Sequence, residues 1–239
     1  MQESAQFTSE EPVDIAGIAR ALFADGPAFA RFLQHHRHRI APVGRLVELV
    51  PHGSDVLDVG CGGGLFVMCL AASGRAARAH GVDASANAIA AADAAARRLR
   101  GQGSSATIVF EHREVQQGLP QGEFGVVSMI DVMHHVPVAA QRRAFDDAAS
   151  RVRAGGFFLY KDMCDAPVWR AGMNRLHDLI MARQWIRYVP IERVDGWAAE
   201  AGLVAERAEE HRMLWYGHEL RVYRRPEGRA ASTARGVNA

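Results

Sequence analysis

The sequence predicts an α/β protein in which a parallel sheet is covered by helices on both faces. Short apolar runs of strand length alternate with stretches of helical periodicity between residues 56 and 160. Four glycines follow the first of these runs directly, and an acidic residue follows the second. Such alternation is typical of buried parallel strands joined by crossover helices.

Length and charge limit what the fold can do. A chain of 239 residues, of which 49% are apolar, can bury one core, so we expect a single domain over residues 13–224. Lys and Arg number 28 and Asp and Glu 27, giving a formal charge of +1. This balance supplies no broad positive field, so nucleic acid is not expected as a partner.

Cysteine usage and apolar runs indicate the compartment. The three cysteines include no CxxC pair, which argues against a disulfide framework and against a thiolate zinc site. No apolar run approaches the ~18 residues of a membrane helix, and the acidic, polar N-terminus lacks the features of a signal peptide. We therefore expect a cytoplasmic protein without membrane contact, and the sequence is compatible with a homodimer.

The N-terminal part is expected to be helical. Residues 1–12 read as a disordered leader, and residues 14–22 carry apolar side chains at helical spacing. The Asp-Gly-Pro sequence at 25–27 interrupts the pattern, and a second amphipathic stretch covers 28–50. Residues 13–50 are therefore predicted to form a helical cap.

The central elements follow from the alternating pattern over residues 51–162. The expected strands are 56–59, 79–82, 107–110, 125–130 and 157–160, and the expected helices are 65–72, 86–99 and 138–152. After them come a helical insertion at 163–190, a helix at 191–201, strands at 203–208 and 212–224, and a disordered tail at 225–239.

The glycines mark a ligand site at a strand-to-helix turn. The first N–H groups of a helix are unpaired and partly positive, and glycines allow a ligand to approach them closely. A dinucleotide fingerprint, G-x-G-x-x-G, requires a third glycine where Leu65 stands. Gly60, Gly62 and Gly64 instead fit G-x-G-x-G, which argues against a nicotinamide dehydrogenase.

Two carboxylates flank this turn. Asp83 follows the second strand, where a carboxylate can accept hydrogen bonds from both hydroxyls of a ribose. Capping of the next helix is the alternative for Asp83, although Ser85 can cap the same helix. Asp58 precedes the glycines, where it would repel a phosphate and would suit the cationic end of an amino acid or orient the loop.

Three segments in this order carry a resemblance to a known family. "VLDVGCGGG", "GVDAS" and "FGVVSMIDVMHHV" resemble the class I S-adenosylmethionine-dependent methyltransferases of the small-molecule type, over residues 40–165. The resemblance implies a Rossmann-like doubly wound sheet that is mostly parallel with an antiparallel last strand. It also implies that residues 51–162 bind S-adenosylmethionine (SAM) and that 163–190 cover the substrate.

The resemblance assigns each part of SAM to residues of this chain. It places the methionine part at Asp58, Gly60, Cys61 and Gly62, the ribose at Asp83 and Ala84, the adenine at Glu114 and Val115, and the sulfonium near Ile130 and Asp131. For Glu114, a solvated loop acid is the alternative. No metal is expected in this site, although Asp162 offers one oxygen ligand that a divalent ion could use.

Two histidines follow the fourth expected strand, at the edge where a methyl group would be delivered. Alignment of the reacting atoms supplies much of the catalysis of methyl transfer, and a base is needed only for a protonated acceptor. A phenol, with a pKa of ~10, is such an acceptor, and a histidine is a suitable base. We predict His135 as the general base and His134 as the second candidate; packing of His135 against the sheet edge is the alternative.

The predicted function is therefore methyl transfer from SAM to a small molecule, most specifically O-methylation of a phenolic, aromatic or other hydroxylated metabolite. Trp169 and Met173 in the insertion favour an apolar acceptor. C- or N-methylation and a non-catalytic SAM-binding partner subunit are the alternatives. The sequence "DVMH" after the fourth strand differs from the D/N-P-P-Y/F tetrapeptide expected of enzymes that methylate nucleic-acid amines.

Overall fold

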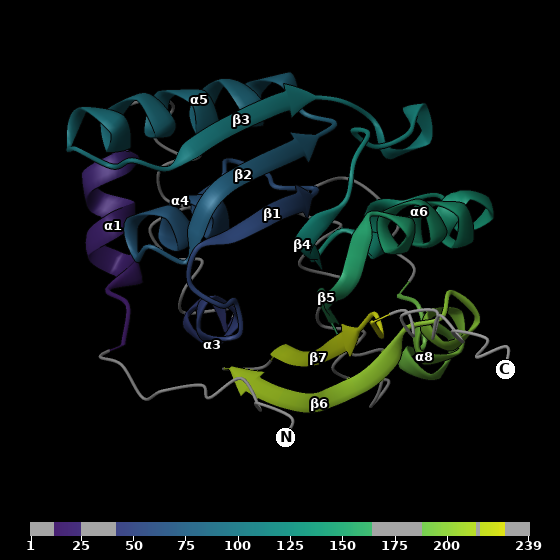
Figure 1. Ribbon diagram of the computed structural model, residues 1–239. Helices are drawn as coiled ribbons and strands as arrows, with labels where there is room; N and C mark the ends of the chain where they lie inside the picture. Colours follow the sequence, from purple (N-terminus) through teal and green to yellow (C-terminus); the bar gives the residue numbers. More distant parts are fainter. Residues whose placement is uncertain (1–11, 25–41, 164–187, 214–215, 228–239) are drawn as a thin grey trace, which may run out of the picture.

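The computed structural model describes residues 12–24, 42–163, 188–213 and 216–227 (Figure 1). Four predicted segments lie wholly or mostly outside these residues: the leader, residues 28–41 of the second N-terminal stretch, the insertion that carries Trp169 and Met173, and the end of the tail. Their predictions, and the division of the chain into segments, stay predictions.

The described strands form one sheet in the order β3-β2-β1-β4-β5-β7-β6. Their bounds are β1 Ser54–Val59, β2 Ala76–Asp83, β3 Thr107–His112, β4 Phe124–Ile130, β5 Val152–Met163, β6 Val204–Met213 and β7 Tyr216–Arg224. Strands β1 to β5 pair in parallel, and β7 runs antiparallel between β5 and β6. The predicted Rossmann-like sheet with an antiparallel last strand is confirmed.

Helices cover both faces of this sheet. The bounds are α1 Ile15–Leu22, α3 Val43–Glu48, α4 Leu65–Ala72, α5 Ala86–Gly101, α6 Val138–Ser150 and α8 Ile191–Glu200. Helices α1, α3, α4 and α5 lie on one side of the sheet, and α6 and α8 lie on the other (Figure 1). The first group contributes to one apolar cluster and the second to another. The described parts of the predicted N-terminal cap thus belong to the helical layer on one face, where α1 and α3 pack against α4.

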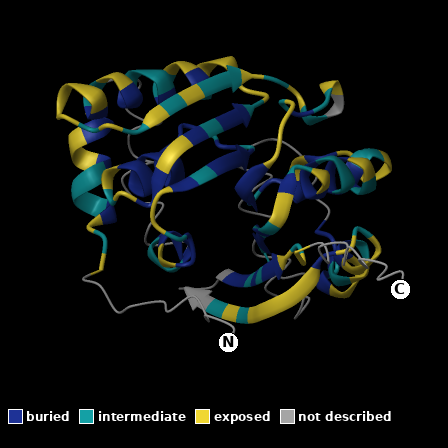
Figure 2. Ribbon diagram, viewed as in Figure 1, coloured by how far each residue is buried: buried dark blue, intermediate teal, exposed yellow. Residues whose placement is uncertain are grey.

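Burial is greatest at the centre of the fold. Every residue of β4 is buried, and α4 is buried from Leu65 to Ala71, because α1, α3 and α5 surround it. The outer strands β3 and β6 show many exposed residues (Figure 2). The carboxyl ends of the central strands are therefore held by well-packed neighbours.

Several predicted boundaries are wrong, among them the starts of β2 and β5, which begin at Ala76 and Val152 instead of 79 and 157. The helix expected to reach Val152 ends at Ser150, because Val152 is buried and pairs with Phe124 as the first residue of β5. The strand expected to begin at 212 begins at Tyr216, since residues 212 and 213 end β6 and pair across a hairpin with 217 and 216. The strand expected to end at 208 therefore continues to 213, where charged residues suit an edge strand.

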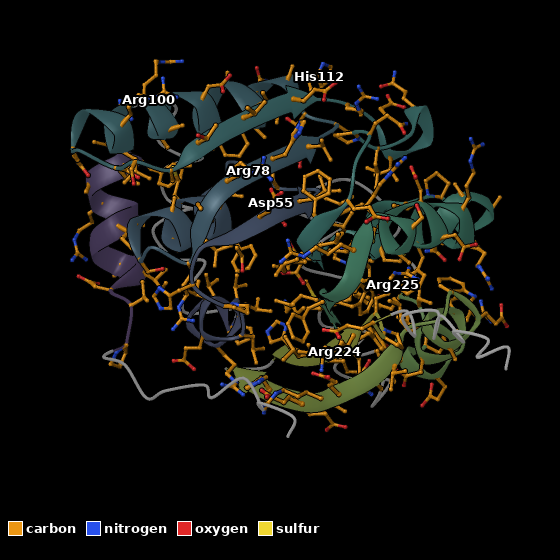
Figure 3. All side chains as sticks on the ribbon, viewed as in Figure 1. Asp55, Arg78, Arg100, His112, Arg224 and Arg225 are labelled. Atoms are coloured by element: carbon orange, nitrogen blue, oxygen red, sulfur yellow. The ribbon has the colours of Figure 1, made fainter. Side chains whose placement is uncertain are left out.

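Arg225, the first residue of the predicted tail, contacts the folded unit. The Arg225 N–H donates to the Gly156 carbonyl at 2.9 Å, and the Gly155 N–H donates to the Arg225 carbonyl at 2.9 Å. The Arg225 guanidinium, which lies beside β5 (Figure 3), donates to the Ala149 carbonyl at 2.8 Å. These contacts make Arg225 part of the folded unit.

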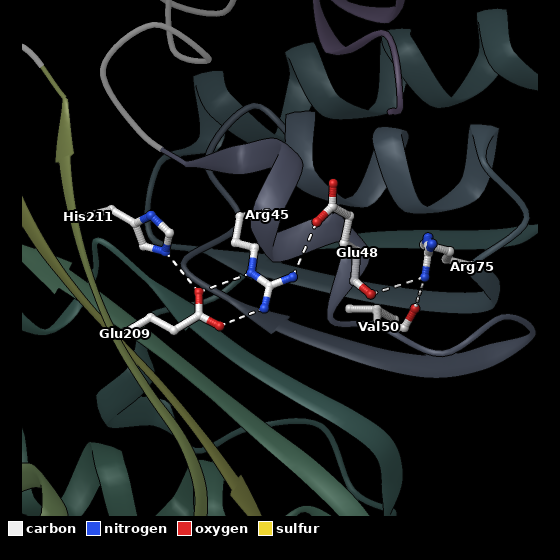
Figure 4. A network of polar contacts seen from close by, with 6 residues as sticks. All are labelled: Arg45, Glu48, Val50, Arg75, Glu209 and His211. Carbon is white, nitrogen blue, oxygen red and sulfur yellow. Dashed lines mark hydrogen bonds and ion pairs between the residues drawn. The ribbon is translucent and has the colours of Figure 1, made fainter. Parts of the chain in front are cut away.

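An ion pair joins the N-terminal helices to the far edge of the sheet (Figure 4). Arg45 in α3 donates from Nη2 and Nε to the two carboxylate oxygens of Glu209 in β6, at 2.6 and 3.0 Å. His211 lies 2.9 Å from the same carboxylate. The hydrogen bonds from Arg45 lower the pKa of Glu209 to about 2.

We expect Glu209→Gln to lower the free energy of unfolding by an amount that depends on pH. An unfolded Glu has a pKa of ~4.3, and the folded pKa of Glu209 is lower, so its contribution is present above the unfolded value and is lost as pH falls toward 2. Urea unfolding at steps from pH 7 to pH 3 measures the difference from wild type, which should be constant above pH ~6 and shrink below pH ~4.5.

The control is Glu200→Gln, which removes the partner of Arg142 from a more exposed ion pair and should change stability less. A wild-type to Glu209→Gln difference that stays constant down to pH 3 would contradict the assignment of the low pKa to Glu209.

Candidate active site

The turn between β1 and α4 requires glycine. Gly60, Gly62 and Gly64 have φ angles of +72°, +54° and +81°, in the region that side chains disfavour. A Cβ on Gly60 would lie 2.3 Å from a methyl group of Val132, and one on Gly64 would lie 2.8 Å from the Phe110 ring. The loop can follow this path next to its neighbours only without side chains at these positions.

Asp83 ties this turn to the end of β2. Its Oδ2 accepts from the Gly62 N–H at 2.8 Å, and its Oδ1 accepts from the Ser85 N–H at 2.8 Å. The cap of α5 is Ser85, whose hydroxyl accepts from the Ala88 N–H at 3.3 Å. The capping alternative for Asp83 is therefore not what the structure shows. Each carboxylate oxygen retains capacity for a further hydrogen bond.

A cleft of about 560 Å³ opens at the carboxyl ends of β1, β2 and β4. The predicted site residues that line it are Gly60, Gly62, Asp83, Ala84, Glu114, Val115, Asp131 and His135. Ser85, Arg113, Val132 and Val136 also line the cleft and were not predicted. A volume of this size is in the range of small-molecule and cofactor sites, and the switch point of a doubly wound sheet is where such ligands bind.

A narrow pocket adjoins the cleft at Gly60, which lines both. The predicted residues Asp58, Cys61 and Ile130 line this pocket. Asp58 is buried, and its Oδ1 accepts from the Ser128 hydroxyl at 2.7 Å. Val43 and Leu46 of α3 form another wall, a contribution that the sequence pattern did not reveal.

The loop after β3 is held by its own polar contacts. Glu114 is exposed and begins the 3₁₀ helix η1 Val115–Gln117, where its N–H donates to the Gln117 side chain at 3.1 Å. Arg113 donates to Glu111 at 2.9 and 2.5 Å and to the Gly118 carbonyl at 3.1 Å. This pairing lowers the pKa of Glu111 and fixes a guanidinium at the cleft.

Asp131 has an unusual backbone that β5 stabilises. Its φ of +57° is the only positive value among the non-glycine residues that the structure describes. Its N–H donates to the Lys161 carbonyl at 2.8 Å, and its carboxylate accepts from the fully buried Lys161 ammonium at 2.5 Å. The ion pair holds the loop after β4 in a conformation that costs free energy by itself.

The two histidines of this loop have different surroundings. They belong to the 3₁₀ helix η2 Met133–His135, in which His134 is buried and His135 is exposed and lines the cleft. Nδ1 of His134 hydrogen-bonds the Asp162 carboxylate, which also accepts from the His134 backbone N–H at 3.3 Å. The centroids of the two rings lie 4.1 Å apart, so the buried ring of His134 packs against the exposed ring of His135.

The arrangement fits SAM. Asp83 stands beside a backbone cradle that a Cβ would fill, and a cleft of suitable volume runs from that cradle past the loops of β3 and β4. Among the described residues, no group of three or more His, Cys, Asp or Glu side chains gathers as a metal site, and the absence of a metal stays a prediction. In the same residues, no helix has the length and apolar character required to cross a membrane.

A family model described as a methyltransferase domain matches residues 29–208. The chain belongs to this methyltransferase family. The ubiquinone biosynthesis O-methyltransferase of Aromatoleum aromaticum is 35% identical over 106 residues, which cover 44% of this chain and 42% of that protein. The protein of the same name from Alkalilimnicola ehrlichii is 28% identical over 160 residues, which cover 64% and 61%.

Solved structures agree with the fold of this methyltransferase. The magnesium protoporphyrin IX methyltransferase from Synechocystis PCC 6803 with bound SAH has a TM-score of 0.62 at 18% identity, and the match covers 87% of this chain and 93% of that one. The chain spans about half the length of the curated relatives that it matches. The predicted SAM-dependent enzyme class and the SAM cofactor are confirmed.

Gly60→Ala should abolish tight SAM binding and lower the free energy of unfolding by about 2 kcal/mol, because a Cβ there meets both a positive φ and the Val132 side chain. Isothermal titration with SAM and urea unfolding measure the two effects. The matched control is Gly196→Ala in α8, where a Cβ meets open space and should stabilise the helix by about 0.5–1 kcal/mol. Unchanged SAM affinity in Gly60→Ala would show that the ligand does not use this turn.

Proposed function

We propose that this methyltransferase methylates a hydroxyl group of a small aromatic or other hydroxylated metabolite, with His135 as the general base. The observation that carries the proposal is the position of His135, which lines the same cleft as Asp83 and Gly62. The names of the curated relatives, ubiquinone biosynthesis O-methyltransferases, support an oxygen acceptor. Because the matches cover only part of those proteins, their substrate is not transferred to this chain.

In the proposed binding mode, each part of SAM lies against the residues that the sequence resemblance assigned. The ribose hydroxyls donate to Asp83 beside Ala84, the adenine lies between the Asp83 turn and the loop of Glu114 and Val115, and the methionine part extends past Gly60 and Gly62 toward Asp58 and Cys61. The position of these residues in one cleft and its adjoining pocket supports this direction. Ile130 and Asp131 would then border the sulfonium.

Charge in the site is arranged to suit a cationic ligand. Asp58 is a buried acid that lines the narrow pocket, and its Oδ1 accepts from the Ser128 hydroxyl. The Asp131 carboxylate already pairs with Lys161, so its role is to shape the loop more than to add a free negative charge. Asp58 is therefore the residue we propose for the amino group of the methionine part.

When bound, SAM supplies an electrophilic methyl carbon that an acceptor oxygen can attack in line with the departing sulfur. The chain's contribution is alignment and removal of a proton. His135, exposed to the cleft, takes the acceptor's hydroxyl proton on a ring nitrogen as the oxygen attacks. His134 supports the ring of His135 from behind, and its own orientation is fixed because its Nδ1–H donates to Asp162.

C- or N-methylation and a non-catalytic SAM-binding subunit stay alternatives. Incubation with labelled SAM and a panel of phenols, amines and activated methylene compounds separates them, because label transfer to phenols alone supports the proposal. The homodimer and the cytoplasmic location also stay predictions.

Asp83→Ala should raise the dissociation constant for SAM by about 10- to 100-fold, because it removes a charged acceptor of ribose hydrogen bonds and releases Gly62 and Ser85. Isothermal titration is the measurement. Asp93→Asn on the surface of α5 is the control and should bind SAM as wild type does. SAM affinity within twofold of wild type in Asp83→Ala would overturn the proposed ribose site.

His135→Ala should lower kcat/KM for a phenol acceptor by about 10²- to 10⁴-fold while the SAM dissociation constant changes little, because the base acts on the acceptor. The wild-type rate should rise with pH as the histidine loses its proton, and the variant should lack this rise below pH ~7. Labelled methyl transfer across pH 5.5–9 tests both, with His52→Ala outside the cleft as control. Activity within a few-fold of wild type, with SAM affinity intact, would refute the role of His135.

A further inference from the structure

Helix α3 forms one wall of the pocket proposed for the methionine end of SAM. Val43 and Leu46 line this pocket together with Asp58 and Gly60. Both side chains are buried in the same apolar cluster as α4. A shift of α3 away from β1 would therefore open the pocket without disturbing the cleft at Asp83.

Local interactions alone cannot hold α3 in place. The helix has six residues and begins after Pro42 with no side-chain cap, and helices of this length are unstable alone. At its C-terminal end, the buried Arg75 donates to the Val50 carbonyl at 2.7 Å and to the Glu48 carbonyl at 3.2 Å (Figure 4). Burial of Val43 also holds the N-terminal half, and a directional polar contact adds to this packing.

That contact comes from β6, at the edge of the sheet. The Arg45 guanidinium donates to both oxygens of Glu209, which lies 164 residues away in the sequence, and also to Glu48 at 3.2 Å (Figure 4). A two-pronged pair of this kind fixes both distance and direction. The side chains are 34% and 22% exposed, so the pair is less screened by water than a fully exposed one.

We infer that Arg45 and Glu209 form a clamp that holds α3 against the methionine end of the site and thereby sets the affinity for SAM. Both are positioning residues, since neither lines the cleft or the pocket. If α3 is closed in only a fraction of molecules, the apparent dissociation constant rises by the inverse of that fraction. The inference rests on the proposed placement of the methionine part and is independent of the methyl acceptor.

The test compares SAM with methylthioadenosine, which lacks both the amino-acid group and the positive charge on sulfur, and follows how each variant changes the affinity for each ligand. Isothermal titration of the full chain with SAM and with methylthioadenosine is performed on wild type, Arg45→Met, Glu209→Gln and the double variant. Each single variant should bind SAM about five- to tenfold more weakly, as expected if the closed fraction falls to roughly 0.1–0.2. The dissociation constant for methylthioadenosine should differ by no more than about twofold among the four proteins, because this ligand does not reach the pocket that α3 lines.

The double variant and a remote ion pair supply the controls. Because the two residues act as one clamp, the double variant should bind SAM no more weakly than either single variant. Arg142→Met breaks the ion pair with Glu200 that joins α6 to α8, away from the pocket, and should change neither affinity. Arg45→Lys keeps the charge without the two-pronged geometry, and should weaken SAM binding by less than Arg45→Met. It replaces Arg45→Met in the test if that variant does not fold.

Each other outcome overturns a defined statement. Unchanged SAM affinity in Arg45→Met and Glu209→Gln, or an equal loss for both ligands, overturns the clamp, because the second result is that of a general loss of stability. The variant Asp58→Asn separates a failure of the clamp from a failure of the proposed binding mode of SAM. If Asp58→Asn weakens SAM binding and Arg45→Met does not, only the clamp fails; if neither does, the placement of the methionine part fails with it.

Discussion

The site depends on one carboxylate that joins two loops. Asp83 accepts from Gly62 in the turn after β1 and from Ser85 in the turn after β2, so both strand ends share a single anchor. The glycine loop can approach β2 this closely because its positions tolerate positive φ. Asp83 therefore organises the glycine loop through two backbone N–H groups, and the ribose role proposed above would use the remaining acceptor sites of the same carboxylate.

Strand β5 makes the corresponding contribution to the loop after β4. Two consecutive residues, Lys161 and Asp162, project to opposite faces of the strand. Lys161 fixes Asp131 in its strained conformation, and Asp162 fixes His134, so the loop after β4 is held from two directions. His135 is then presented at the cleft on a rigid support.

The predictions that were correct depended on patterns among residues close together in the sequence. The strand-helix alternation and the G-x-G-x-G turn placed β1 to β5 and the cleft correctly, because a parallel sheet brings all its carboxyl ends to one edge. Boundaries were wrong where an apolar residue fits either of two neighbouring elements. Val152 is one case, because an apolar residue at this position would also fit the buried face of the preceding helix, whereas it is the first residue of β5. The β6–β7 hairpin was also misplaced because the charged residues of an edge strand show weak alternation.

The sequence by itself determined the α/β class, the glycine turn and the spacing from that turn to Asp83, because each is written in a short stretch of neighbouring residues. Only the tertiary structure decided that β7 lies between β5 and β6, that Val43 and Leu46 wall the pocket, and that Arg45 meets Glu209 across 164 positions. These contacts join residues far apart in the chain. Their geometry follows from how the layers pack, and packing leaves no periodic signal in the local sequence.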